Sequence, residues 1–495
     1  MTAAEPRREP PGPGRAAPRP HPEPPEADGA GGAAAGHLPL DTPDAPEARE
    51  AAGRRDQAVR AAVRGGLIGP DRPVIGLLDV TGIRAAARAL HSAFAEVSAD
   101  GTALLHAFAV KAAPLVPVLR LLAAEGLGCE VASPGELALA RAAGLTPART
   151  VLDSPAKTPA ELREALALGI AVNVDSRGEL SRLDALVASA PTASPLGVRV
   201  NPQVGGGSIA ALSTATATSK FGIPLRDEGA RTWLVRAFLD RPWLTRLHAH
   251  SGSQGMPLDL LAASVRAVYE LAEEINQAAG ARRIDTIDIG GGLPVNFASD
   301  TVVPGYRDYA GTLRAAVPGL FDGRYGLVTE FGRSLVAKSG TVLARVEYVK
   351  TAGSRPIAIT HAGAQLAVRT VYAPESWPLR VAAYDAEGRP KPATVLVPQD
   401  VAGPCCFAGD LVATARPLPP LAAGDHTALL DTGAYYFAHH YAYNSLPRPG
   451  VYGFLADPDG AVRFAAIRDP QPLTDIVRES GGGHADALIG LDPRG

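Results

Sequence analysis

Several reactive side chains follow short apolar runs that are typical of buried strands. Lys111 follows HAFAV, His250 ends LTRLHAH, and Glu330 ends GLVTE, while Gly290–Gly292 and Arg333 lie in turns after two such runs. A lysine can form an imine with an aldehyde, and glycine-rich turns with an arginine can bind phosphate. An imidazole can stack on a ring face, and a carboxylate can hold a protonated ring nitrogen. Each residue alone has an ordinary structural explanation, but together they meet the needs of pyridoxal phosphate.

A second candidate is the stretch GPCCFAGD (403–410), which holds two of the three cysteines of the chain. A disulfide between neighbours such as Cys405 and Cys406 would be strained, and no CxxC spacing indicates zinc, so we predict neither a redox pair nor a metal site. A catalytic thiol and a small packed residue remain open at this point. So few cysteines fit a reducing cytosol, and we predict a cytoplasmic protein.

The elements that must position these residues alternate between strand and helix patterns. Helical segments with 3.6-residue apolar spacing separate eight strand candidates, which predicts a (β/α)8 TIM barrel with its active site at the carboxyl ends of the strands. A doubly wound open sheet would show the same alternation. The strand candidates are 103–111, 128–132, 150–153, 171–174, 196–200, 245–250, 285–289 and 326–330.

Composition divides the remaining chain. Residues 1–45 are rich in Pro, Ala and Gly and are predicted to form a disordered tail. Residues 46–99 form a lead-in segment that either domain could use, and residues 100–335 form the barrel. Residues 336–475 show no helical spacing and are predicted to form an all-β domain of barrel or sandwich type, followed by a tail at 476–495. A net charge of −3 and no apolar run of about 18 residues argue against nucleic-acid and membrane partners.

Taken together, the motifs resemble those of the diaminopimelate/ornithine decarboxylase family, fold-type III enzymes that bind pyridoxal 5'-phosphate. The resemblance runs in order from about residue 70 to 455. It implies an alanine-racemase-like barrel with a β domain, and a head-to-tail homodimer with shared active sites. It is carried by FAVKAAPLVPVLRLLAAEGLGCEVASPGELALARAAG, SKFGIP, HSGSQG, IDIGGGLP, EFGRSLVAKSG, GPCCFAGD, GAYYF and YNSLPRP.

The resemblance implies a role for each matching residue. Lys111 resembles the Schiff-base lysine, His250 the residue that stacks on the cofactor ring, and Glu330 the partner of its nitrogen. Cys406 aligns with a thiol that the partner subunit contributes to protonate the product carbon. The implied phosphate and substrate contacts are Ser253, Gly291, Gly292, Gly332, Arg333 and Tyr435, with Phe331 in the place of the family's proline.

The chain departs from the family where the far end of the substrate is bound. An acidic residue follows the catalytic cysteine in the family and pairs with a distal ammonium, whereas Phe407 and Ala408 stand here. A buried ammonium without a counter-charge costs on the order of several kcal/mol. Arg333 and Arg369 match two arginines that bind a distal carboxylate, although the tyrosine of RTVY (369–372) is out of register. We therefore expect an amino acid with a distal anion, either a carboxylate or a carrier-tethered group, and no distal ammonium.

Three other functions stay open. A true diaminopimelate decarboxylase of lysine biosynthesis with an unusual pocket fits the general likeness. A racemase using the same cofactor would place an arginine where Glu330 stands, and a non-catalytic cofactor-binding protein would lack the β domain with Cys406 and Tyr435. The small-residue segment 203–222 is either a flexible connector or a lid over the substrate.

Overall fold

The computed structural model describes residues 45–436 and 439–491. The predicted disordered tail therefore lies outside the described residues, apart from Ala45. Within the described ranges, no helix is both long and apolar enough to cross a membrane.

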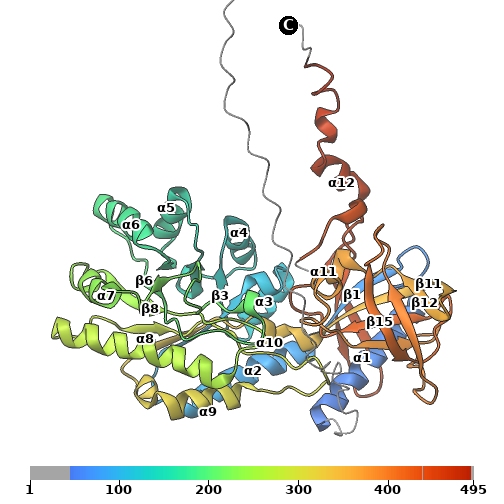
Figure 1. The fold of residues 1–495 in the computed structure, drawn as a ribbon, viewed down its shortest axis with the longest axis horizontal. Coiled ribbons are helices and arrows are strands. Elements are labelled where there is room, and N and C mark those ends of the chain that lie inside the picture. Colours follow the sequence, from blue (N-terminus) through green and yellow to red (C-terminus); the bar gives the residue numbers. More distant parts are fainter. Residues whose placement is uncertain (1–44, 437–438, 492–495) are drawn as a thin grey trace, which may run out of the picture. The chain divides into compact units, whose positions relative to one another are not determined.

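Eight parallel strands form the first sheet and close on themselves (Figure 1). Their order is β5-β4-β3-β2-β10-β9-β8-β6, and β5 also pairs with β6 through Val172 opposite Leu196. This closure confirms the predicted barrel and excludes the open sheet. The strands are β2 (Leu104–Ala109), β3 (Gly128–Val131), β4 (Thr150–Asp153), β5 (Ala171–Val174), β6 (Leu196–Asn201), β8 (Leu244–His248), β9 (Thr286–Asp288) and β10 (Gly326–Thr329), with the two-residue β7 (Ile223–Pro224) beside β6.

The helices that cover the barrel begin and end at residues suited to those positions. In α5, Thr158 and Glu161 form a capping box, Pro159 occupies the first turn, and Gly169 ends the helix with a φ of 76°. The helices are α3 (Val116–Ala124), α4 (Pro134–Ala142), α5 (Pro159–Leu168), α6 (Arg177–Ser189), α7 (Ala230–Leu239), α8 (Leu258–Ala279) and α9 (Tyr306–Ala316).

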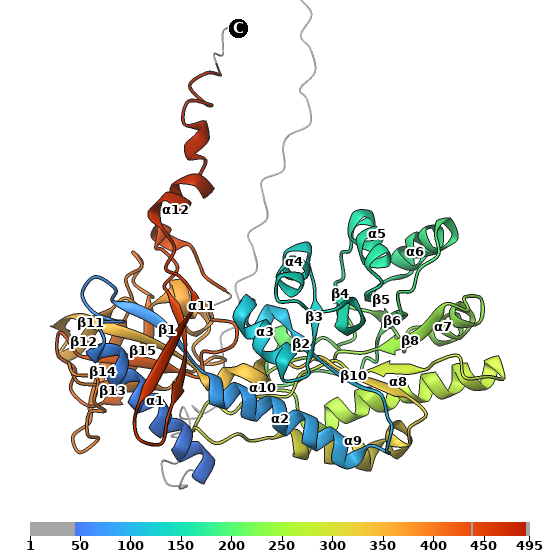
Figure 2. The same cartoon turned by 180° about the vertical axis from the view of Figure 1, so that it is seen from behind.

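The helix that completes the ring around the barrel does not come from the segment after the last strand. Strand β10 is followed only by the short α10 (Arg333–Val336), and α2 (Val80–Val97) packs against both α9 and α3 instead (Figure 2). A helix does follow the last strand, but it is only four residues long. A helix from the lead-in segment completes the ring, and Asp79 caps its first turn by accepting from the Thr81 N–H.

The second sheet has nine strands and takes one of them from the lead-in. Strand β1 (Val74–Asp79) pairs antiparallel with β11 and parallel with β17, so the lead-in gives a strand to the second sheet and a helix, α2, to the barrel. Helix α1 (Pro46–Arg64) packs on β17 and β18. The other strands are β11 (Gly340–Ala352), β12 (Arg355–Thr360), β13 (Val381–Tyr384), β14 (Val397–Ala402), β15 (Leu411–Leu418), β16 (His426–Leu430), β17 (Val451–Ala456) and β18 (Val462–Arg468).

The sequence pattern indicates no helices after residue 335, but the structure has two further helices there. Helix α11 (Ala364–Tyr372) lies in the β domain and carries Arg369, and α12 (Leu473–Glu479) follows the last strand. The predicted β-sheet domain is confirmed. Helix α11 is a short helix within it, and its nine residues are too few for a clear apolar period to appear among strand-like runs.

Candidate active site

A cavity of about 250 Å³ lies at the carboxyl ends of the barrel strands and extends to the β domain. It collects most of the residues that the sequence singled out. The predicted residues Gly291, Cys406 and Phe407 do not line it. Those that do are Lys111, His250, Ser253, Gly292, Glu330, Gly332, Arg333, Arg369 and Tyr435.

Lys111 stands in a 3-10 turn directly after β2, and its side chain is 42% exposed, toward the cavity. Its Nζ lies 2.5 Å from Oε2 of Glu130, a buried residue of β3. Burial lowers the pKa of Lys111, but Glu130, Tyr435 and Glu330 outweigh it and raise the pKa above its usual value. Glu130 therefore stabilises the ammonium form of Lys111.

His250 is held in one orientation by its neighbours. The Gly291 N–H donates to His250 Nδ1 at 3.1 Å, and the hydroxyl of Thr214 donates to the His250 carbonyl. Burial, aided by Arg199 and Lys111, lowers the pKa of His250 well below its usual value, so the ring is neutral. Since Nδ1 accepts a hydrogen bond, the ring proton sits on Nε2. A neutral, fixed imidazole at the cavity suits stacking on a flat ligand.

Glu330 ends a buried charged cluster beneath the cavity. His248 lies between two carboxylates, with Nδ1 3.1 Å from Asp153 Oδ2 and Nε2 3.4 Å from Glu330 Oε2. Burial, with the charges of Asp153 and Glu130, raises the pKa of Glu330 well above its usual value. Its Oε1 is buried without a hydrogen-bond partner among the described residues. An orphaned acceptor at a cavity fits a ligand that donates a hydrogen bond there, as a protonated ring nitrogen does.

Glycines bring the backbone close to the cavity. A Cβ on Gly291 would collide with the Glu330 carbonyl oxygen, and one on Gly292, whose φ is +106°, would lie 2.5 Å from the carbonyl oxygen of Gly252. Gly332 is similarly crowded, because a Cβ there would lie 2.9 Å from that of Ala112. This close backbone suits a phosphate group, which free N–H groups can approach.

Phe331 does not enter the cavity, although it replaces the proline of the family motif. It is 1% exposed, and its ring centroid lies 5.1 Å from that of Tyr306, 5.9 Å from that of Tyr309 and 6.2 Å from that of Phe94. Its side chain therefore packs beneath α2 and α9 and anchors the turn that carries Gly332.

Two arginines form the opposite wall. The Cζ atoms of Arg333 and Arg369 lie 4.5 and 4.7 Å from the ring centre of Tyr435 and 4.6 and 5.0 Å from that of Trp377. Burial lowers the pKa of Arg333 to about 10, an effect to which the charge of Arg369 adds. Within the part of the chain that the structure describes, neither guanidinium has a carboxylate within 4 Å. The wall therefore carries two positive charges facing the cavity without a counter-charge.

Tyr435 joins the β domain to the barrel mouth. Its N–H donates to the Ala112 carbonyl at 2.7 Å, one residue from Lys111, and its φ is +68°, which is uncommon for a bulky residue. Gly433 makes the approach possible, because a Cβ there would collide with the Val336 carbonyl oxygen. Such strain at a ligand cavity is typical of functional positions.

The segment 203–222 lies against the site. The Thr214 N–H donates to the Ser251 carbonyl and the Ser253 N–H to that of Leu212, while Leu212 and Phe221 line the cavity. Phe221 also receives the guanidinium of Arg199 at 4.4 Å. In this conformation the segment forms part of the cavity wall.

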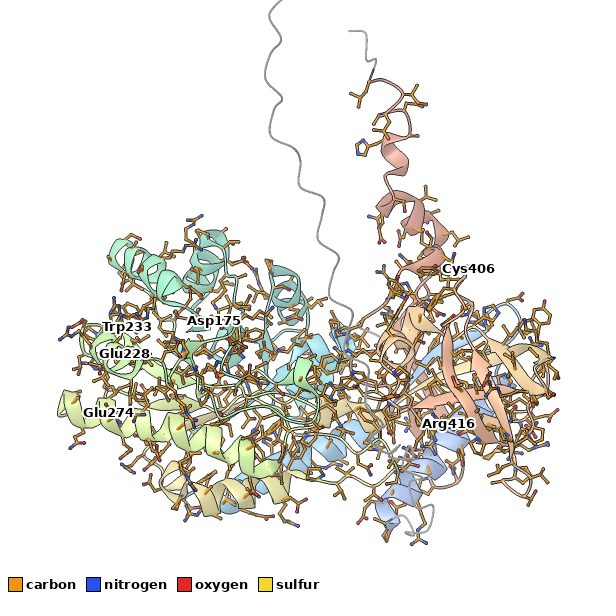
Figure 3. The ribbon with its side chains drawn as sticks, viewed as in Figure 1. Asp175, Glu228, Trp233, Glu274, Cys406 and Arg416 are labelled. Carbon is orange, nitrogen blue, oxygen red and sulfur yellow. The ribbon has the colours of Figure 1, made fainter. Side chains whose placement is uncertain are left out.

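Cys405 and Cys406 point to different surroundings. Cys405 is buried, and its Sγ lies 3.7 Å from the amide oxygen of Gln365. Cys406 is exposed on the β domain, in the loop after β14 (Figure 3). Phe407 stacks on Tyr372 at 5.5 Å, with Tyr443 beside it at 5.4 Å. The Cys406 thiol therefore lies on the surface of the β domain, next to a cluster of aromatic side chains.

Sequence reasoning missed three members of the site. Glu130 was hidden in the strand GCEVA, where its charge inside an apolar run was the available signal. His248 precedes His250 by two residues, so strand alternation could have placed both on one face. Trp377 gave no local signal, because its contact with the arginines exists only in the folded chain.

The described residues fit pyridoxal phosphate: a lysine at the mouth, an orphaned carboxyl oxygen, a neutral imidazole and a close backbone converge on one cavity. The family of pyridoxal-dependent decarboxylases matches residues 81–337 with its pyridoxal binding domain, and the chain belongs to this family. It is a carboxy-lyase of the diaminopimelate decarboxylase type.

The relatives agree with this assignment. The chain is 34% identical to a diaminopimelate decarboxylase of Pseudomonas aeruginosa over 74% of its own length and 84% of the relative's. It is 31% identical to that of Zymomonas mobilis over 76% and 85%. The crystal structure of diaminopimelate decarboxylase from Helicobacter pylori complexed with L-lysine superposes with a TM-score of 0.71 at 27% identity, covering 83% of this chain and 97% of that one.

Proposed function

We propose that the protein removes the α-carboxylate of an amino acid whose far end carries an anion and no ammonium group. The observation that carries this proposal is the pair Arg333 and Arg369, which brings two guanidiniums to the cavity without a carboxylate within 4 Å among the described residues. A carboxylate held by two arginines gains charge-assisted hydrogen bonds in a partly desolvated place.

Phe407 and Ala408 support the second half of the proposal. They follow Cys406 where the family places an acid, and Phe407 lies in an aromatic stack with Tyr372 and Tyr443. Such a surface gives a distal ammonium no anionic partner. A substrate whose distal end carries no ammonium group avoids the cost of desolvating that charge.

The second protein chain is part of the proposal. Cys406 does not line the cavity of its own chain and stands exposed beside an aromatic cluster. A homodimer in which this loop enters the partner's cavity would bring a thiol to the reacting carbon and cover the exposed aromatic rings.

Each residue then has a chemical task. Bound pyridoxal phosphate supplies the electron sink for the carbanion left when CO2 departs. Lys111 would hold the aldehyde carbon of the cofactor, and Glu130 would control the charge of the Lys111 amine. Glu330 would keep the ring nitrogen protonated, and the neutral His250 would fix the ring plane. Cys406 of the second copy would give its proton to the product carbon.

Ser253, Gly292 and Gly332 would bind the phosphate, and Arg333 and Arg369 would orient the substrate by its far end. Leu212 and Phe221 place apolar side chains in the cavity wall, which would exclude water there. Exclusion of water strengthens each of these electrostatic contacts.

A true diaminopimelate decarboxylase is the second candidate, and the relatives favour it, since those quoted above carry that name. The two candidates share every catalytic residue and differ only in the distal group.

Release of CO2 from a panel of amino acids tests the proposal. Amino acids with a distal carboxylate should react, and ornithine and meso-diaminopimelate should react slowly or not at all. Lys111→Ala should abolish every reaction. Rapid turnover of meso-diaminopimelate would establish the second candidate instead.

A further inference from the structure

A second cavity, of about 460 Å³, lies at the opposite end of the barrel. Its walls include the first residues of several strands, among them Leu104 of β2, Thr286 of β9 and Gly326 of β10. Because these are amino-terminal strand ends, the cavity is separate from the candidate active site at the carboxyl ends.

Arg246 of β8 reaches this cavity from inside the barrel. Barrel interiors are dominated by Val, Ile and Leu, so an arginine among them carries a desolvation cost. Gly197 makes room for it, since a Cβ there would lie 2.7 Å from that of Arg246. Burial lowers the pKa of Arg246, and its buried Nε has no hydrogen-bond partner among residues 45–436 and 439–491.

Arg149 reaches the same cavity from a different element, the 3-10 turn Pro147–Arg149 before β4. One of its terminal nitrogens donates to the Gly126 carbonyl, and its Nε is buried and unpartnered in the described chain. Neither Arg149 nor Arg246 has a carboxylate within 4 Å among the described residues. Two guanidiniums therefore line one cavity without a carboxylate partner in the described chain.

Two acids stand nearby and reduce this positive charge only in part. Asp285 does not line the cavity but precedes Thr286, whose hydroxyl donates to it at 2.7 Å. Asp288 lies deeper, and burial with the charge of Glu330 raises its pKa to about 8, so it is largely protonated at neutral pH. The remaining wall is apolar, with Leu104, Leu105 and Val328.

We propose that this cavity binds a small aliphatic carboxylate, with its carboxylate between Arg149 and Arg246 and its hydrocarbon part against the leucines and the valine. Inorganic phosphate would share the charge but not the apolar contact. The cavity is large enough to admit a ligand of this class.

Isothermal titration of the holoenzyme with butanoate, and separately with inorganic phosphate, tests the proposal. Butanoate should bind more tightly than phosphate. Arg246→Met and Arg149→Met should each weaken butanoate by about tenfold or more, the expected loss of a charge-assisted contact. Arg282→Met is the matched control, because Arg282 is exposed and does not line the cavity.

The active site could also bind an anion, so Arg369→Met is titrated in parallel. Butanoate affinity that survives Arg369→Met and falls in both cavity variants supports the proposal. Affinity that falls only in Arg369→Met, or no binding by the wild type, overturns it. Arg246→Lys keeps the charge at that position and should retain most of the affinity for butanoate. If Arg246→Met does not fold, the result for Arg149→Met decides.

Discussion

Glu130 determines the charge of the lysine at the cavity, because its carboxylate lies 2.5 Å from the Lys111 amine. Glu130→Gln removes that charge and keeps a hydrogen-bonding side chain. The pKa of Lys111 should fall, so Lys111 should capture pyridoxal phosphate at a pH lower by about one unit or more. Borohydride trapping of the cofactor on the Lys111 peptide at several pH values measures this. An unchanged pH midpoint would show that Glu130 does not control the amine.

Asp288 makes stability depend on pH in the opposite direction from most carboxyls. Its pKa is raised to about 8 in the folded chain, and an unfolded Asp titrates near pH ~4. Between these values the folded state holds a proton that the unfolded state lacks, so the free energy of unfolding falls as pH rises. Asp288→Asn should remove up to about 1.4 kcal/mol per pH unit of this slope. Urea unfolding from pH 5 to 8 measures the slope, and equal slopes in both proteins would contradict the assignment.

Phe407 is the residue to exchange for a change of specificity. Phe407→Glu restores an anion beside Cys406, so the variant should raise kcat/KM for meso-diaminopimelate by about tenfold or more. Phe407→Gln is the control, since it is polar without the charge. Equal gains in both variants would assign the effect to size rather than charge.

The sequence was most informative for residues in sequential motifs. Lys111, His250 and Glu330 follow strands, and the barrel rule then places strand ends together. Glu130 and Trp377 act through contacts between distant segments, which no local pattern displays. The position of Cys406 relative to a cavity could be judged only after the chain was folded.

Among elements, the turn after β9 shows how closely the backbone of the site is packed. A side chain on Gly291 would collide with the Glu330 carbonyl, so Gly291→Ala should lower the free energy of unfolding by about 1–3 kcal/mol. Cofactor affinity should fall with it. Gly178 of α6 is the control, because a Cβ there meets nothing within 4 Å. Gly178→Ala should be neutral or stabilise by about 0.5–1 kcal/mol. Chemical denaturation and cofactor titration compare the two, and similar effects would contradict the close packing.

The barrel strands were predictable because each is a short buried run between helices with clear caps, such as Thr158 before α5. Strand β1 and helix α2 were not assigned, since their partners β11 and α9 lie more than two hundred residues away in the chain. Local pattern identifies an element, whereas its partner depends on the closed fold.

At the scale of the molecule, the proposed shared active site can be tested by mixing defects. Lys111→Ala and Cys406→Ala are each expected to be nearly inactive. In random mixed dimers one site in four combines an intact lysine with an intact thiol, so about a quarter of wild-type activity should return. CO2 release from co-expressed variants measures it. No recovery would place both residues in the same chain's site or exclude the dimer.

The proposed substrate has a distal anion and no distal ammonium. Two substrates differ in that group alone: 2-aminopimelate and meso-diaminopimelate share the chain and both carboxylates. The most direct measurement is kcat/KM of the wild-type holoenzyme for each. We expect 2-aminopimelate to be preferred by about tenfold or more, since Phe407 offers an ammonium no counter-charge. A preference for meso-diaminopimelate would contradict the claim.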